Sequence, residues 1–256
     1  MAELNRQTYA GAQTGVDAID EGLRAFMLRV YNYMAAGLAI TGVAAYGIYA
    51  MSITTDASAA VATLPNGTLL TSLGHLIFVS PLKWVLLFAP LVMVFFLAAR
   101  VHKMSVETAQ ITFWIYAALV GVSISSIFLV YAHGSIARVF FITAAAFAGL
   151  SLYGYTTKKD LSGWGSFLIM GLIGVVIASI VNIFVGSTAL QFAISVIGVL
   201  VFSGLTAYDT QQIKEDYYAG DSQVVAGQKA IMGALRLYLD FLNLFLMLLS
   251  LFGNRE

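Results

Sequence analysis

The sequence predicts an all-α integral membrane protein, a bundle of seven transmembrane helices with almost no soluble domain. Of its 256 residues, 60% are hydrophobic and 10% are charged, whereas a soluble domain has roughly 25% charged residues. The mean hydropathy is +0.87. Stretches such as Ile169 to Ile183 are apolar on every face, whereas a barrel strand alternates apolar and polar residues. A chain of this kind cannot cover itself with a polar surface.

Most of the hydrophobic runs reach the roughly 20 residues that a helix needs to cross the hydrocarbon core. They span residues 29–51, 82–99, 109–131, 136–155, 164–185, 188–209 and 230–252. The second contains Pro90 and the fourth has Arg138 near its start, so these two are the weakest spans. Residues 29–253 therefore form the predicted membrane domain, and residues 254–256 form a short tail.

Lys and Arg alternate between the connecting segments, which indicates an orientation by the positive-inside rule. One set of segments carries Arg6, Arg24, Arg29, Arg100, Lys103, Lys158, Lys159, Lys214 and Lys229. The other set carries Lys83, Arg138 and Arg255. We therefore expect residues 1–28 to be cytoplasmic and the loop at about 52–80 to be external. A last segment that re-enters instead of crossing would return the C-terminus to the cytoplasm.

Composition also limits the function. Residues 1–28 lack an early apolar core, so we expect no cleavable signal peptide. The formal charge of zero argues against a nucleic-acid partner. The absence of cysteine excludes a disulfide scaffold. Asn66-Gly67, within the long loop, is read as a turn.

Small residues recur four positions apart within the spans, a spacing that lets helix backbones approach closely in lipid. The pairs are Ala35 and Ala39, Gly121 and Ser125, Ala144 and Ala148, and Ser203 and Ala207. We expect ordinary packing within one bundle from them, rather than a dimer interface.

Ionisable residues at membrane depth cost roughly 2.5 to 3.5 kcal/mol at a helix centre, so each is a functional candidate. Asp209 closes the sixth span, and Asp240 lies inside the seventh, one turn after Arg236. The two helices should be antiparallel neighbours, since a short connection joins them. If the last helix begins near Ile231, Asp240 lies about 13 Å along it. The sixth helix must then continue past Thr210 for the carboxylates to meet.

Two carboxylates in a poorly hydrated site cannot both be ionised cheaply, so the pair should bind a proton or a cation. Hard oxygen ligands favour Ca²⁺, although two carboxylates alone cannot fill its six to eight ligand positions. Alternatively, Arg236 and Asp240, four residues apart, neutralise each other. Tyr208, Tyr238 and Asn243 are candidate donors around the aspartates, with packing and interfacial anchoring as their default roles.

Four sequence strings resemble the bacterial branch of the Bax inhibitor-1 family, also called the transmembrane Bax inhibitor motif proteins. They are Ala207-Tyr208-Asp209-Thr210-Gln211, Leu239-Asp240-Phe241-Leu242-Asn243-Leu244-Phe245, Ser125-Ser126-Ile127-Phe128 and Gly171-Leu172-Ile173-Gly174. The resemblance covers about Arg29 to Gly253, and its last two spans are the specific part.

The resemblance implies a seven-helix fold whose last helix is wrapped by two three-helix layers. It also implies a pH-sensitive calcium leak in a bacterial inner membrane, controlled by an aspartate pair that maps to Asp209 and Asp240. Arg100 matches an arginine that latches one aspartate in the closed state, and its alternative role is a positive-inside anchor. Arg236 departs from this simple pattern, because its charge could weaken cation binding at Asp240.

We therefore expect a non-enzymatic protein without a cofactor, in which Ca²⁺ is the transported or sensed ion. The paired aspartates should share one proton near neutral or mildly acidic pH, and the sign of the response depends on which group binds it first. A membrane adaptor that binds other membrane proteins without conducting ions is the main alternative. An intramembrane aspartyl protease also needs two aspartates, but Leu237-Tyr238-Leu239-Asp240 lacks its Gly-x-Gly-Asp setting.

Overall fold

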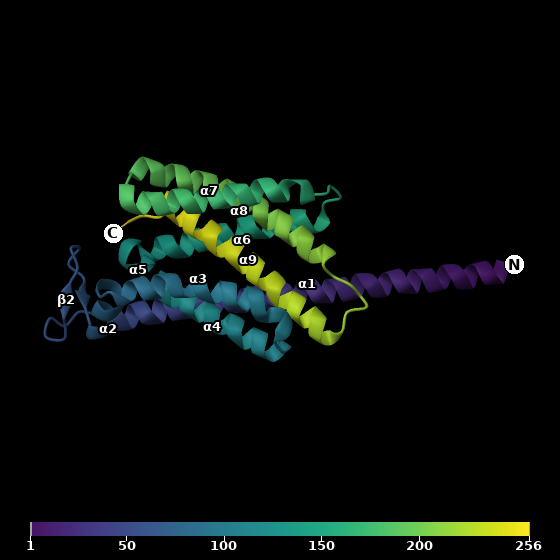
Figure 1. Ribbon diagram of the computed structural model, residues 1–256, viewed down its shortest axis with the longest axis horizontal. Coiled ribbons are helices and arrows are strands. Elements are labelled where there is room, and N and C mark those ends of the chain that lie inside the picture. Colours follow the sequence, from purple (N-terminus) through teal and green to yellow (C-terminus); the bar gives the residue numbers. More distant parts are fainter. Residues whose placement is uncertain (1, 256) are drawn as a thin grey trace.

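The protein is an elongated bundle of long helices in the computed structural model (Figure 1). The structure describes residues 2–255, and it describes side chains from Glu21 onward. The side chain of Arg6, which contributes to the orientation count, and Glu256 of the predicted tail lie outside these limits. The long helices are α1 (Ala2–Ser52), α3 (Leu82–Arg100), α4 (Val106–Ile124), α6 (His133–Thr156), α7 (Ser162–Val185), α8 (Thr188–Glu215) and α9 (Gln223–Phe252).

Seven stretches of the described chain are helical, long and apolar enough to cross a membrane, which confirms the predicted fold class. They are Glu21–Ser52, Leu82–Lys103, Val106–Val130, His133–Thr156, Ser162–Val185, Thr188–Glu215 and Gln223–Phe252. Both weak spans are present, and α3 continues through Pro90. The third span bends at Ser125, where α4 ends and the short α5 (Ile127–Val130) follows. There the Ser125 hydroxyl donates a hydrogen bond to the Val122 carbonyl at 2.7 Å.

Several helix boundaries are set by local chemistry. Ser105, Ser187 and Ser222 precede α4, α8 and α9, and each side chain accepts a hydrogen bond from a backbone N–H in the first turn. At the other end of α7, Gly186 has a φ of +64°, the left-handed conformation that glycine adopts without steric cost. These caps allow the short turns that join antiparallel spans.

The long connection after α1 folds into a small antiparallel sheet of β1 (Ile53–Thr54), β3 (Leu69–Leu70) and β2 (Ala62–Thr63), in that order. Short helices follow at α2 (Ser72–Gly74) and η1 (His75–Val79), and η2 (Val101–Lys103) follows α3. The predicted turn at Asn66-Gly67 is confirmed: Gly67 has a φ of +84°, and the Asn66 side chain accepts from the Thr68 N–H at 3.2 Å.

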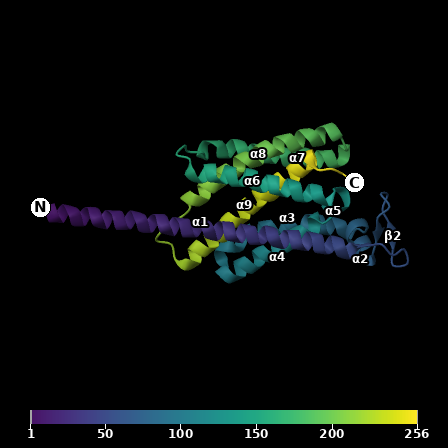
Figure 2. The same cartoon turned by 180° about the vertical axis from the view of Figure 1, so that it is seen from behind.

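Two groups of helices lie on either side of α9. Figures 1 and 2 show α9 running obliquely between α1, α3 and α4 on one side and α6, α7 and α8 on the other. It contacts α1, α4, α6 and α8. Its most apolar window is 56% buried, against 33% or less for the other six spans. The expectation that the last helix is the centre of two wrapped layers stays a prediction.

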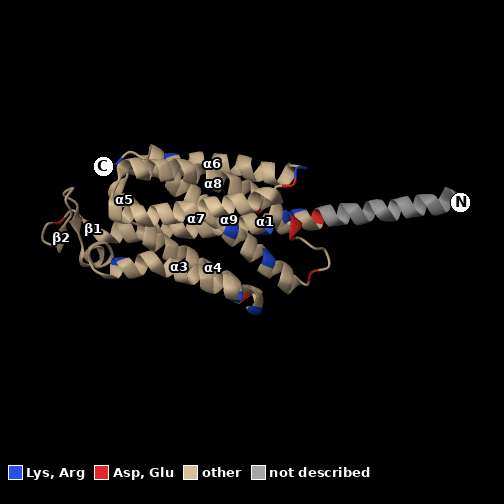
Figure 3. Ribbon diagram, turned by 45° about the horizontal axis from the view of Figure 1, so that its top comes forward, with Lys and Arg blue, Asp and Glu red and all other residues tan. Residues whose placement is uncertain are grey.

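The start of α9 differs from the prediction. This helix begins at Gln223, about two turns before the expected start near Ile231. The sequence of this region, Gln223-Val224-Val225-Ala226-Gly227, is too polar and glycine-containing to count as a membrane run, yet Ser222 caps it and it continues into the span. Lys and Arg gather near the end of the bundle from which α1 projects (Figure 3). The cytoplasmic assignment of that end stays a prediction.

Candidate functional site

Asp209 and Asp240 are brought together by the antiparallel pair α8 and α9. Helix α8 continues for six residues past Asp209 to Glu215, so this carboxylate lies within the helix and not at its end. Asp240 lies 17 residues into α9. The continuation of α8 and the early start of α9 together place both side chains below the connecting loop 216–222.

The two carboxyl groups lie close enough to share a hydrogen bond when one of them carries a proton. Asp240 is only 4% exposed, and Asp209 is half-buried. An ionised carboxylate is only an acceptor, so a hydrogen bond between two carboxyl groups requires a proton on one of them. The Asp240 Oδ2 atom is buried and has no hydrogen-bond partner among the described residues. A buried carboxylate oxygen that has no donor is costly to keep charged.

Arg236 is a positive charge that acts on both aspartates. Its guanidinium Nη1 lies 3.9 Å from Asp216 Oδ2, and both side chains are roughly half exposed. Among the described residues, the two ion pairs are this one and Lys229–Asp221. Arg236 therefore pairs with the loop carboxylate and not with Asp240, so the alternative in which Arg236 and Asp240 directly neutralise each other does not describe this conformation.

Arg100 lies apart from the aspartates in this structure. It ends α3, is exposed to the surroundings, and its guanidinium carbon lies 6.0 Å from the centre of the Phe96 ring. Neither ion pair between described side chains involves it. The role of Arg100 as a latch on an aspartate stays a prediction.

The other three candidate donors point elsewhere. Tyr238 is fully buried, and its hydroxyl lies 2.6 Å from Thr41 Oγ1 in a hydrogen bond that ties α9 to α1. Asn243 donates to the Leu239 carbonyl of its own helix at 2.8 Å. Tyr208 packs against Gly165 of α7, where an added side chain would collide with the tyrosine ring. In the described part of the chain, no hydrogen bond joins these three residues to either aspartate.

Sequence reasoning missed a chain of hydroxyl groups next to Asp209. Tyr31 Oη and Ser151 Oγ lie 2.6 Å apart, and Ser151 Oγ lies 2.9 Å from Thr210 Oγ1. Thr210 donates in turn to the Thr206 carbonyl at 2.7 Å. This chain links α1, α6 and α8, and Thr210 directly follows Asp209. Polar residues inside the apolar runs, with Thr206 and Thr210 four apart, were the available signal.

Side chains near the same end tie the connecting loops to the helices. Gln211 accepts from the Leu161 N–H at 2.7 Å and donates to the Lys159 carbonyl at 2.9 Å. Lys214 donates to the Tyr155 carbonyl at 2.9 Å, and Gln228 donates to the Met104 carbonyl at 2.8 Å. These bonds fix the surroundings of the aspartate pair, because they hold the ends of α6, α7 and α3 against α8 and α9.

The donor set limits what the pair can hold. Within the described residues, no group of three or more His, Cys, Asp or Glu side chains converges on one point. A resident Ca²⁺ takes six to eight oxygen ligands. The aspartate pair by itself offers two carboxylate groups toward that number.

The family model described as "Inhibitor of apoptosis-promoting Bax1" matches residues 23–256. The chain belongs to the Bax inhibitor-1 family. This membership confirms the resemblance found in the sequence strings of α8 and α9.

Relatives of this Bax inhibitor-1 protein cover almost its whole length. It is 46% identical to the inner membrane protein YbhL of Escherichia coli (strain K12), over 92% of this chain and 94% of that protein. It is 47% identical to an uncharacterized protein of Rickettsia prowazekii, over 93% and 92% of the two chains, and 47% identical to one of Caulobacter vibrioides over the same shares. Together with the seven apolar helices, these relatives identify an integral protein of the bacterial inner membrane.

Proposed function

We propose that this protein is a calcium leak of the inner membrane whose opening depends on pH through Asp209 and Asp240. The single observation that supports this function most strongly is the contact between two carboxyl groups from neighbouring helices, one of them almost fully buried. No reaction is catalysed and no cofactor is needed under this proposal, and Ca²⁺ is the transported ion.

The proposed gate works through the shared proton. With one proton, the carboxyl groups attract each other and hold α8 against α9. Without it, two negative charges at contact distance in a poorly hydrated site repel each other, and the repulsion is reduced by separation of the helices or by a passing cation. Asp240 Oδ2, which has no described partner, is the proposed first contact of that cation.

Arg236 and Arg100 have different proposed roles. Arg236 stays near the pair and pairs with Asp216, so it limits how strongly the site attracts Ca²⁺. Arg100 is proposed as a latch in a conformation that brings the end of α3 to the aspartates. Removal of either charge should therefore change the calcium flux. Loss of Arg236 should raise the flux directly, because Arg236 already lies near the pair. Loss of Arg100 should act only through the conformation in which the end of α3 reaches the aspartates.

Calcium flux into liposomes tests the proposal. Purified protein is reconstituted into vesicles that contain a calcium-sensitive dye, and the initial rate is measured from acid to alkaline pH. Wild type should pass Ca²⁺ at a rate that varies with pH, while Asp209→Asn and Asp240→Asn should each remove most of that variation, since neither leaves two carboxyl groups to share the proton.

Glu215→Gln is the matched control. Glu215 is exposed in the last turn of α8, so this variant removes one acidic charge from the same helix and leaves the pair intact. It should keep the pH profile of wild type. Absence of flux in the wild type would overturn the leak and leave the adaptor as the remaining function. An unchanged pH profile in both asparagine variants would overturn the gate.

A further inference from the structure

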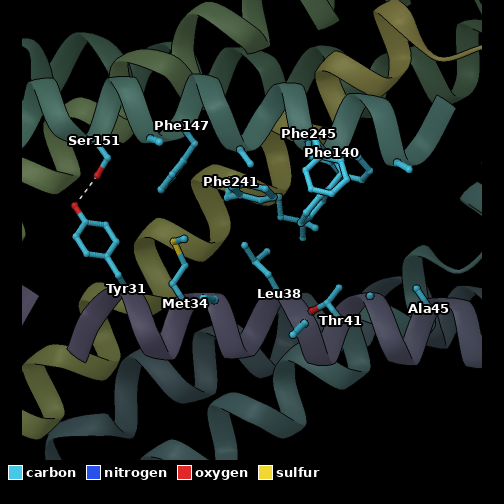
Figure 4. Close-up of a pocket in the computed structure, with 18 of the residues that line it drawn as sticks. Tyr31, Met34, Leu38, Thr41, Ala45, Phe140, Phe147, Ser151, Phe241 and Phe245 are labelled. Atoms are coloured by element: carbon cyan, nitrogen blue, oxygen red, sulfur yellow. Dashed lines mark hydrogen bonds between the residues drawn. The ribbon is translucent and has the colours of Figure 1, made fainter. Parts of the chain in front are cut away.

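An apolar groove of about 1230 Å³ runs between α1 and α6. Its walls are side chains of α1 and α6 that point toward each other, and side chains of α9 close it from behind (Figure 4). The labelled wall residues are Tyr31, Met34, Leu38, Thr41 and Ala45 of α1, Phe140, Phe147 and Ser151 of α6, and Phe241 and Phe245 of α9. Neither the flux proposal nor its aspartates involve this groove.

Small residues keep the groove open. Ala35 and Ala39 of α1 and Ala144 and Ala148 of α6 all line it. Their small side chains leave space between the two helices, and the packing expected from their spacing stays a prediction for these four residues. Gly121 behaves as predicted: a side chain there would collide with the backbone of Thr41.

The size and lining of the groove restrict its occupant. Almost all of its lining side chains are apolar, and apolar cavities do not hold ordered water. From Arg24 to Tyr46, its limits along α1, the distance is about 33 Å at 1.5 Å per residue, close to the roughly 30 Å of a bilayer core. An acyl chain is a narrow, flexible and apolar occupant that matches this length and lining.

The two ends of the groove differ in charge. Arg24 lies at one end and is exposed, and no described carboxylate pairs with it. The other end is aromatic, where the rings of Tyr46, Phe128 and His133 lie 5.6 to 6.5 Å apart. Arg24 is the one Lys or Arg among the described residues that line the groove, and it favours an amphipathic molecule with an anionic head on that side.

We infer that the groove binds a membrane phospholipid with an anionic headgroup, which enters sideways from the bilayer. Its phosphate lies at Arg24, and an acyl chain extends along Leu38 and Ala39 toward the phenylalanines of α9. About two turns along α1 from Arg24, the hydrogen bond between Tyr31 and Ser151 bridges the groove. The acyl chain of the lipid passes outside this hydrogen bond, over Leu28 and Leu152, which are 52% and 62% exposed.

Native mass spectrometry of the detergent-purified protein tests the inference, with phosphatidylglycerol and phosphatidylcholine of identical chains as the added probes. Wild type should retain one phosphatidylglycerol, and Ala148→Phe, which fills the groove, should lose it. Ala145→Phe is the matched control, because Ala145 is exposed on the same helix but does not line the groove. Arg24→Gln should remove about a fivefold preference for phosphatidylglycerol over phosphatidylcholine.

A second measurement avoids bulky substitutions, and it is possible because the chain has no cysteine of its own. Added phosphatidylglycerol should slow maleimide labelling of Ala39→Cys and leave labelling of Ala145→Cys unchanged. Equal lipid retention by wild type and Ala148→Phe would overturn the inference. A labelling rate of Ala39→Cys that is the same with and without lipid, as expected for Ala145→Cys, would also overturn it. So would a second polypeptide that protects position 39.

Discussion

Two faces of α9 differ in chemistry although they belong to the same stretch of helix. Asp240 faces α8, with its carboxyl group near that of Asp209, and nearby polar side chains tie the surrounding loops in place. The next residue, Phe241, and Phe245 one turn later face the groove between α1 and α6, where almost nothing is polar. The difference shows how one helix can carry a proposed proton-binding site on one face and a proposed lipid-binding surface on the other.

The largest expected effect is that substitutions on the two faces change different properties, namely the pH dependence of calcium flux and the retention of lipid. Asp240→Asn should remove most of the pH dependence of calcium flux and leave phosphatidylglycerol retention unchanged, because it alters only the carboxyl pair. Ala148→Phe should have the opposite effects. Both properties are measured on each purified variant by liposome flux and native mass spectrometry. If either variant alters both properties to a similar extent, the two faces are coupled and the contrast fails.

The next effect compares two glycines of α6. A side chain at Gly154 would collide with the backbone of Ala207 on α8, whereas nothing lies within 4 Å of one at Gly149. Gly154→Ala should lower the free energy of unfolding by about 1–3 kcal/mol. Gly149→Ala should raise it by up to about 1 kcal/mol, because alanine favours helix. Unfolding in detergent measures both, and equal stabilities would show that α6 does not pack tightly on α8.

A smaller effect is expected at the hydroxyl chain between the two regions. Tyr31→Phe removes the 2.6 Å hydrogen bond to Ser151 and should cost about 0.5–1.5 kcal/mol of stability. Tyr33→Phe, on the same helix, removes a longer bond of 3.3 Å to Gln110 and serves as the control. Thermal unfolding of both variants is the measurement. If Tyr33→Phe lowers the stability as much as Tyr31→Phe does, the hydroxyl groups of Tyr31, Ser151 and Thr210 have no special role in stability.

The smallest effect is local and depends on acid. Hydrogen bonds from the hydroxyl and then the backbone N–H of Ser162 lower the pKa of the exposed Asp160 carboxyl. A lowered pKa means that the contact is fully present above the ordinary value of about 3.9. It is lost as pH falls through the lower folded value. Hydrogen exchange of the Ser162 amide should become faster in wild type as the Asp160 carboxyl is protonated. In Asp160→Asn, the loss of this contact should not depend on pH. The same pH dependence of exchange in both proteins would refute the prediction.

The contrast between the faces also shows how far sequence reasoning reaches. The fold class, the seven spans, the turn at Asn66-Gly67 and the family follow from hydropathy and from strings such as those around Asp209 and Asp240. The course of α9 before Ile231 was missed, because its early turns are too polar to count as a membrane run. The hydroxyl chain from Tyr31 was missed because its members lie 120 and 59 residues apart.

The sequence by itself determined that this chain lies in a membrane as long helices and that two aspartates near the last loop are costly to bury. Those properties follow from composition and spacing, which are local. Only the tertiary structure decided that Arg236 pairs with Asp216, that Arg100 lies apart, and that alanines on α1 and α6 border a groove. The physical reason is that helix crossing brings together residues from distant spans, and a spacing of four along one helix does not specify whether its small face meets another backbone or lipid.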